Sequence, residues 1–236
     1  MSEVILIVPC HPERRERLVR AAVRLGDLIG GGRVVELAPA LVEAAFGGTR
    51  YAPLVAPAYR APEVAAIEER GRRADFLVAA QSEAGDDKAT CMEFRAALFR
   101  TERPVLIVPP HGGAAAFGRR VAIAWRDDAR TVKALMPALK LLSGADEVHL
   151  LAGVRAGNSP PGIPRVLLEH GVSARLHVLP IGAGHFGEVL LERARELDVD
   201  MLIAGAHAHT RLHDMLLGGV TSYMIAHADR PMLLRN

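Results

Sequence analysis

Aromatic residues are scarce in this chain, which has 236 residues and only 4% Phe, Trp and Tyr. A protein that stacks nucleic-acid bases on its surface needs more of them, so that class is disfavoured. Charge of one sign is also lacking, because 29 basic and 27 acidic residues leave a net charge of only +2. Nucleic-acid-binding proteins usually show a clear basic excess. The composition therefore predicts no nucleic-acid partner, and the core must come from Ala, Val, Leu and Ile.

Cysteines are few and long apolar runs are missing. Cys10 and Cys91 lie far apart without metal-like spacing, so the sequence predicts no disulfide framework and suits a reducing cytosol. No apolar run approaches the roughly 20 residues that span a bilayer. The opening residues lack the basic start of a secretory signal, and their apolar run stops at Pro9. We therefore expect a cytoplasmic protein without a membrane partner.

An internal repeat is the main feature that the chain does contain. Three segments of the first half resemble three of the second half in the same order: 4–8 and 121–125, 73–79 and 198–204, 103–108 and 230–234. The separations drift by only a few residues, as loop insertions and deletions would produce, so we infer two homologous halves. The Pro/Gly/Ala stretch 109–114 has the composition of a linker. We therefore assign two domains, residues 1–109 and 119–236.

Both halves alternate short apolar runs with segments of helical periodicity, which is typical of an α/β fold with a parallel sheet covered on both faces. For the first half we predict strands near 4–8, 33–38, 75–79 and 104–108, a weak strand near 54–55, and helices at 13–29 and 63–73. For the second half we predict strands near 120–125, 147–152, 174–179, 200–204 and 231–235, and helices at 128–142, 162–170, 186–197 and 212–227. Asp127 or Asp128 can cap the helix 128–142, and Pro137 should kink it or loosen one turn.

One loop of the second half has the composition of an anion site. The strand near 200–204 is followed by 205–211 (GAHAHTR) and then by 217–222 (LGGVTS). In an open α/β sheet, ligands bind at the carboxyl ends of strands, and a glycine loop before a helix presents backbone N–H groups to an anion. The alternative is that Gly205 merely ends a strand and that Gly218 and Gly219 allow close packing.

The same segments resemble the universal stress protein family in its tandem two-domain form. The resemblance is carried by 200–207 (DMLIAGAH), 217–221 (LGGVT) and 226–234 (AHADRPMLL). It covers the second half well and the first half only in outline. It implies two Rossmann-like domains of the adenine nucleotide hydrolase-like type, in a stress-response protein that binds an adenine nucleotide and regulates rather than turns over a substrate.

Dimers of this family often form through the last strand of each chain. The equivalent strands here, 105–108 and 232–234, are both apolar. An exposed apolar strand edge invites pairing. We therefore predict that the two halves pack as an intramolecular pseudo-dimer, and a homo-oligomer or protein partner is left open.

The family's nucleotide-binding motif, G-x2-G-x9-G-(S/T), is altered in this chain. Gly205 and Gly218 fit its first and third glycines, but Ala208 replaces the second and Gly219 replaces the Ser or Thr. Ala208 adds a Cβ where the backbone should approach a phosphate, and Gly219 lacks the hydroxyl donor. The acidic residue that the family places after the first strand is Arg126 here, whose guanidinium could contact phosphate directly.

By resemblance, ATP or another adenine nucleotide is expected to bind weakly in the second half. The expected site residues are Ala124, Arg126, Gly205, His207, Ala208, Gly218, Gly219 and Thr221. Thr221 could partly replace the lost hydroxyl. The corresponding loop of the first half, 79–83 (AAQSE), has no glycine pattern, so the site of that half is expected to be lost.

Two other functions stay open. An ATP-using adenylating or hydrolytic α/β enzyme would need a Ser- and Gly-rich loop after the first strand, and the loop 126–129 (RDDA) is not of that kind. A ligand-free scaffold in which both sites have decayed is the other. No catalytic motif stands out.

Three further groups of polar residues have simpler interpretations. The histidines at 185, 207, 209, 213 and 227 lack a Cys or carboxylate at metal spacing, so we favour polar loops over a metal site. The arginines at 14, 15, 17, 20 and 24 are interpreted as a solvated helix face, and Glu83, Asp86 and Asp87 as an exposed loop.

Overall fold

The computed structural model divides the chain into two compact units, residues 1–116 and 117–236. It describes residues 3–38, 45–46, 49–55, 64–111, 116–206, 208–209, 216–217 and 219–236. The pseudo-dimeric packing of the two units stays a prediction.

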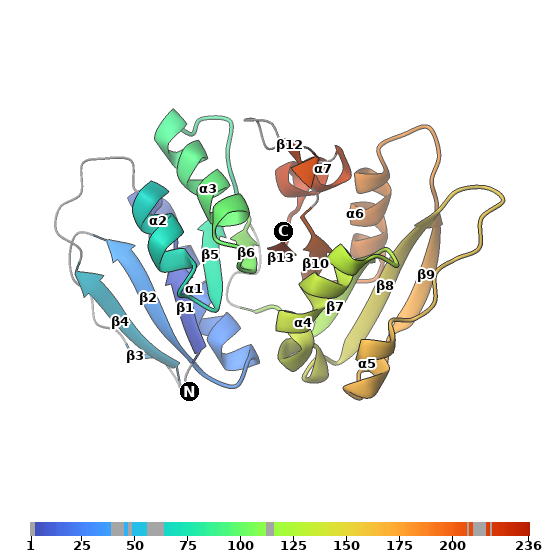
Figure 1. Ribbon diagram of the computed structural model, residues 1–236, viewed down its shortest axis with the longest axis horizontal. Coiled ribbons are helices and arrows are strands. Elements are labelled where there is room, and N and C mark those ends of the chain that lie inside the picture. Colours follow the sequence, from blue (N-terminus) through green and yellow to red (C-terminus); the bar gives the residue numbers. More distant parts are fainter. Residues whose placement is uncertain are drawn as a thin grey trace. The chain divides into compact units, whose positions relative to one another are not determined.

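The first unit is a largely parallel sheet with helices on its faces (Figure 1). Its strands are β1 (Glu3–Ile7), β2 (Gly32–Ala38), β3 (Ala45–Phe46), β4 (Thr49–Val55), β5 (Phe76–Ala80) and β6 (Val105–Val108). Its helices are α1 (Pro12–Leu28), α2 (Val64–Gly71) and α3 (Lys88–Arg100). The strands β4-β2-β1-β5-β6 are parallel in that order, and β3 is antiparallel to β4.

The second unit repeats this topology. Its strands are β7 (Arg120–Trp125), β8 (Glu147–Val154), β9 (Arg175–Pro180), β10 (Met201–Gly205), β11 (Ala208–His209), β12 (Leu216–Leu217) and β13 (Met232–Arg235). Its helices are α4 (Ala129–Ser143), α5 (Arg165–Glu169), α6 (Phe186–Glu196) and α7 (Gly219–His227). The strands β9-β8-β7-β10-β13 are parallel in that order, and β11 pairs with β12 in a separate antiparallel ribbon. The strand order matches that of the first unit, as the sequence repeat predicts.

Continuous apolar runs form the central strands because both faces of the sheet are covered. Every residue of β6 and of β10 is buried, and Ile5, Leu6 and Ile7 of β1 are at most 2% exposed. Burying one such aliphatic side chain contributes about 1.5–3 kcal/mol. Right-handed crossovers place α4 on one face of the second sheet, and α6 and α7, which contact each other, on the opposite face.

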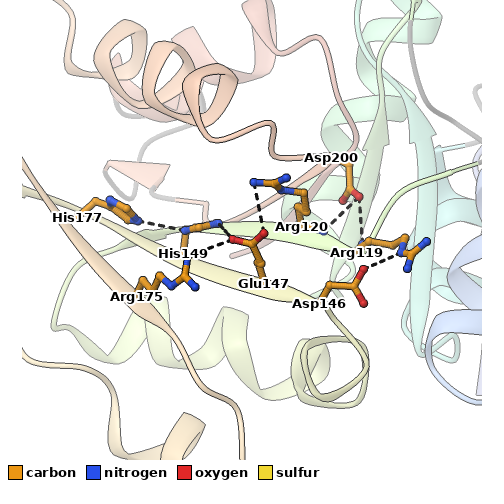
Figure 2. Close-up of polar contacts among 8 residues, drawn as sticks. All are labelled: Arg119, Arg120, Asp146, Glu147, His149, Arg175, His177 and Asp200. Atoms are coloured by element: carbon orange, nitrogen blue, oxygen red, sulfur yellow. Dashed lines mark hydrogen bonds and ion pairs between the residues drawn. The ribbon is translucent and has the colours of Figure 1, made fainter.

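A carboxylate at the start of the fourth parallel strand ties the first strand in each unit. In the first unit, the Asp75 carboxylate accepts the backbone N–H of Val4 at 2.8 Å. In the second, the Asp200 carboxylate accepts the N–H group of Gly118 at 2.8 Å. It also accepts those of Arg119 and Arg120, both at 3.1 Å (Figure 2). All these amides lie near the start of the first strand, where the ladder leaves donors unpaired. The two halves of the sequence repeat therefore share this aspartate and its hydrogen bonds to the backbone near the start of the first strand.

Pro137 lies inside α4, which continues through it to Ser143 rather than ending there. A proline has no N–H, so the carbonyl four residues earlier, that of Lys133, loses its helical donor. The guanidinium of Arg235, at the end of β13, lies 3.3 Å from that carbonyl and donates to it. The expected disturbance of the helix is therefore compensated by a side chain from the last strand.

Several boundaries differ from the prediction. The helix α3 was not predicted, because its buried residues Ala96, Ala97, Leu98 and Phe99 are consecutive rather than spaced at helical intervals. The predicted helix 162–170 shrinks to α5, which begins after Pro164, a residue in extended conformation. The predicted helix 212–227 is wrong at its start, because Leu216–Leu217 form β12 and α7 begins at Gly219. Residues 212–215 lie outside the described residues. The weak strand predicted at 54–55 is the end of β4.

Replacing Asp200 by Ala should lower the free energy of unfolding of the second unit by about 1–3 kcal/mol. The reason is that the backbone N–H groups at the amino end of β7 lose a charged acceptor. Unfolding in urea can be followed by the fluorescence of Trp125, the single tryptophan of the chain, which lies in this unit. Asp146→Ala is the matched control. Its carboxylate is 55% exposed and pairs with Arg119, so its loss should cost under about 1 kcal/mol. Equal effects of both substitutions would contradict the role of Asp200.

Candidate functional site

The chain reverses its direction of travel across the second sheet between β7 and β10. From β7 the chain leads through α4 to β8 and then to β9 on one side, whereas β10 and β13 lie on the other side of β7. The segments that leave β7 and β10 therefore diverge to opposite faces, and such a switch point is where open α/β sheets hold ligands.

A cavity of about 340 Å³ lies at this switch point. It is lined by Ala124, Trp125, Arg126, Thr131, Leu151, Gly153, Arg155, Ile181, Phe186, Leu190, Ala204, Gly205, Gly219, Val220, Thr221 and Met224. Its volume is at the lower end of the range for small-molecule sites, about 300–1,000 Å³. Most of the lining is apolar, which suits a flat, uncharged ring system.

Gly153 sets the width of the cavity on the β8 side. A Cβ at this position would lie 2.4 Å from Cζ of Phe186, at the start of α6. The missing side chain lets the Phe186 ring approach the strand and form a wall of the cavity. The predicted strand 147–152 stopped one residue short of this glycine, and a glycine at a strand end is the signal that could have marked it.

The polar groups of the cavity are basic or neutral. Arg126 and Arg155 are its charged lining residues in the described part of the chain, and neither Asp nor Glu lines it there. Gly219, Val220 and Thr221 form the first turn of α7, where backbone N–H groups lack helical acceptors and the helix dipole favours an anion. The arrangement can therefore hold a ligand with an apolar body and a negatively charged group.

Asp128 organises the Arg126 side of the cavity. Its carboxylate caps α4 by accepting the Thr131 N–H at 2.9 Å, and Arg126 Nε donates to its other oxygen at 2.6 Å. Burial alone would raise the pKa of Asp128, but the hydrogen bonds from Thr131 and Arg126 outweigh it and hold the pKa at about 2. Of the two predicted caps, Asp128 is the one that the structure shows.

Five of the eight predicted site residues line this one cavity: Ala124, Arg126, Gly205, Gly219 and Thr221. His207 and Gly218 lie outside the described residues, and Ala208 is described only by its place in β11. The sequence did not indicate Trp125, Arg155, Phe186 or Leu190. Their places depend on how β8 and α6 pack, and residue spacing does not reveal that.

The histidines that the structure describes near α7 stack on an aromatic ring. Tyr223 lies between two imidazoles, with ring centroids 5.3 Å from His185 and 4.1 Å from His227. His207 and His213 lie outside the described residues. Within the described ranges, no group of three or more His, Cys, Asp or Glu side chains is arranged to hold a metal ion.

Charged side chains meet after β1 and β5 in the first unit, the region that corresponds to the cavity. Arg14, only 8% exposed, lies 2.6 Å from Asp86 and 3.2 Å from Glu83. The hydrogen bond to Asp86 raises the pKa of Arg14, and the same bond lowers the pKa of Asp86 against the opposing effect of burial. The prediction of a solvated arginine face and an exposed acidic loop is therefore wrong for Arg14 and Asp86.

Three more groups in the same region are accounted for by the structure. The Arg15 guanidinium holds the nearly buried Glu36 carboxylate with two hydrogen bonds, at 2.7 and 2.8 Å. Burial raises the pKa of the Cys10 thiol to about 11, with a contribution from Glu36, so Cys10 is a neutral thiol. Asp87 caps α3 by accepting the Thr90 N–H at 2.8 Å.

Comparison with known proteins identifies the second unit. Residues 136–234 match the universal stress protein family. This unit is a universal stress protein domain. The match begins within α4 and ends in β13, so it includes β10, α7 and most of the cavity lining. No curated protein sequence is significantly similar to the chain.

Two solved structures share the fold over nearly the whole length of the chain. A universal stress protein from Archaeoglobus fulgidus DSM 4304 has a TM-score of 0.73 and 14% identity, with 98% of this chain and 96% of that chain covered. A functionally unknown protein from Pseudomonas aeruginosa PAO1 has a TM-score of 0.60 and 13% identity, with 99% and 92% covered. Identities this low show the fold alone. No helix in the described ranges is long and apolar enough to cross a membrane.

Replacing Asp128 by Ala should destabilise the universal stress protein domain by about 1 kcal/mol, because α4 loses its N-cap. The measurement is again urea unfolding followed by Trp125 fluorescence. Asp127→Ala is the matched control, since Asp127 is exposed and does not cap the helix. The stability that Asp128 contributes should be complete above its ordinary pKa of 3.8 and should disappear as the pH falls towards about 2. A loss as large in Asp127→Ala would contradict the assignment.

Proposed function

We propose that the protein is a stress-response binding or regulatory protein of the universal stress protein type, and that its second unit binds an adenine nucleotide weakly. The observation that supports this most is the cavity at the switch point of the second sheet. Five residues that family resemblance assigns to a nucleotide site line it together.

The adenine ring would lie in the apolar part of the cavity. Leu151, Phe186 and Met224 supply apolar surface from β8, α6 and α7. The phosphates would face the first turn of α7, near Gly219 and Arg126. The guanidinium of Arg126 is already bonded to Asp128, so it would contact phosphate through its remaining N–H groups.

Weak rather than tight binding follows from the altered loop. Each lost contact to a charged phosphate costs on the order of 1–3 kcal/mol. Two such losses would move a micromolar dissociation constant towards millimolar, because each 1.4 kcal/mol corresponds to about a factor of ten. Ala208 and Gly219 are the two departures that account for these losses.

Restoring the family motif should strengthen binding. In the double variant Ala208→Gly/Gly219→Ser, the loop regains a close backbone approach and a hydroxyl donor. The described residues leave room for the serine, because a Cβ at Gly219 meets none of their atoms within 4 Å. Calorimetric titration with ATP, AMP and cyclic AMP should show a dissociation constant at least about tenfold lower than that of the wild type. No gain in the double variant, or tight stoichiometric binding already in the wild type, would contradict the proposal.

Narrowing the cavity should have the opposite effect. In Gly153→Ala, the new Cβ displaces the Phe186 ring into the space that the adenine would occupy. Binding in the same titration should become at least about tenfold weaker. Gly182→Ala is the matched control, since a Cβ there meets no atom within 4 Å. Circular dichroism verifies that both variants are folded, and unchanged affinity in folded Gly153→Ala would place the ligand elsewhere.

A further inference from the structure

A row of polar side chains crosses the second sheet (Figure 2). It lies nearer the amino ends of the strands than the cavity, since His149 precedes Leu151 and Gly153, the β8 residues that line the cavity. The imidazoles of His149 on β8 and His177 on β9 face each other, with Nδ1 of His149 3.1 Å from Nε2 of His177. The other nitrogen of His177, Nδ1, lies 3.2 Å from Nη2 of Arg193 on α6. At the far end, Nε2 of His149 lies 3.4 Å from a carboxylate oxygen of Glu147.

Arg193 fixes the direction of every hydrogen bond in this row. A guanidinium has donors only, so Nδ1 of His177 must accept. The proton of a neutral His177 then sits on Nε2 and is donated to Nδ1 of His149. The proton of a neutral His149 sits on Nε2, which lies 3.4 Å from the Glu147 carboxylate but makes no hydrogen bond within the described residues. With both imidazoles neutral, a donor faces an acceptor both between Arg193 and His177 and between His177 and His149.

A proton added to either imidazole removes one hydrogen bond of the row, whichever nitrogen binds it. On Nδ1 of His177 it faces the N–H of Arg193. On Nδ1 of His149 it faces the N–H of His177, and a change of tautomer in His177 only moves the conflict back to Arg193. Two donors then point at each other, so one hydrogen bond is lost in every protonated arrangement.

The surroundings of the pair also oppose a positive charge. His149 is 1% exposed. Burial lowers the pKa of His149, Glu147 partly offsets this, and Arg175, Arg120 and Arg193 lower it further. Burial also lowers the pKa of His177, together with Arg193, His149 and Arg175. The facing elements thus contribute three guanidinium groups against Glu147, while Glu196 is 2.6 Å from Arg193.

The pair also holds one wall of the cavity. Phe186, Leu190 and Arg193 follow one another at helical spacing on α6, so they share a face of that helix. The first two line the cavity, and the third bonds the imidazole of His177. The contacts of α6 with β9 and β8 in this region therefore depend on a neutral His177, which accepts a hydrogen bond from Arg193 and donates one to His149.

We propose that His149 and His177 form an acid-sensitive clamp, which fastens α6 to the sheet at neutral pH and loosens this wall of the cavity when the imidazoles become protonated. Because the clamp acts on the fold of the second unit, it does not depend on which ligand the cavity binds.

The sign of the pH dependence follows from proton uptake on unfolding. In the unfolded chain both imidazoles have the ordinary pKa of 6.5, and in the folded unit their pKa is lower. Between the folded and the ordinary pKa the unfolded state binds more protons, so acidification favours unfolding. The contribution of the clamp is complete above the ordinary value, falls as the pH drops through this window, and then levels off below the folded pKa.

The test compares urea unfolding of the wild type with that of His149→Leu/His177→Leu, followed by Trp125 fluorescence between about pH 7.5 and 5.0. Over this range the unfolding constant of the wild type should rise at least about fivefold more than that of the double variant, since every protonated arrangement loses one hydrogen bond. His170→Gln is the control, because its imidazole is exposed and bonds the Val166 carbonyl of its own helix. It should keep the wild-type dependence. An equal rise in the double variant would overturn the proposal.

A second measurement does not require any variant to fold. Imidazole resonances of the wild type, followed by NMR during acid titration, report both the tautomer and the proton uptake of each histidine. We expect two neutral Nε2–H imidazoles at pH 7 that take up protons only below the ordinary pKa of 6.5. Resonances of His149 and His177 that titrate at or above this value, or that show the Nδ1–H tautomer, would overturn the proposal.

Discussion

The right-handed crossover between parallel strands is the constraint from which the candidate site arises. A sheet that starts at β7 and grows outward through β8 and β9 must return to the other side of β7 to add β10 and β13. The reversal forces α4 and α7 to opposite faces and leaves the carboxyl ends of β7 and β10 uncovered. The cavity, the exposed first turn of α7 and the place of Arg126 all result from that single reversal.

The two units share one topology but have different side chains at the switch point of the sheet. In the second unit a mostly apolar cavity remains at the switch point, and Arg126 after β7 is bonded to Asp128 at its side. In the first unit, Arg14 reaches from α1 to Asp86 and Glu83 in the corresponding region. A buried ion pair of this kind is costly to break, because removal of one partner leaves an uncompensated charge. One copy of the repeat therefore keeps a cavity where the other has internal charge pairing.

The sequence predicted those features that depend on local composition. The strands with continuous Val, Ile and Leu, the two-fold repeat and a cap at Asp127 or Asp128 are all readable from neighbouring residues. The helix α3 was missed because a run of consecutive buried residues has no helical period, although Asp87 before it is a normal helix cap. The contact between His149 and His177 joins residues on neighbouring strands that are offset by two positions in the strand register, and it has no signal in either segment. Likewise, the wall formed by Phe186 depends on the missing side chain of Gly153, which becomes visible only once β8 and α6 are packed.

The hydrogen bond from Arg235 to the carbonyl that Pro137 leaves unpaired joins nearly the last residue of the chain to the first helix of its unit. During synthesis on the ribosome, α4 emerges about a hundred residues before its missing donor. Until β13 has docked, the Lys133 carbonyl lacks the Arg235 donor, so the contact is completed only when the last strand has been made. A chain shortened by a few residues would therefore lose this contact to α4 as well as its last strand.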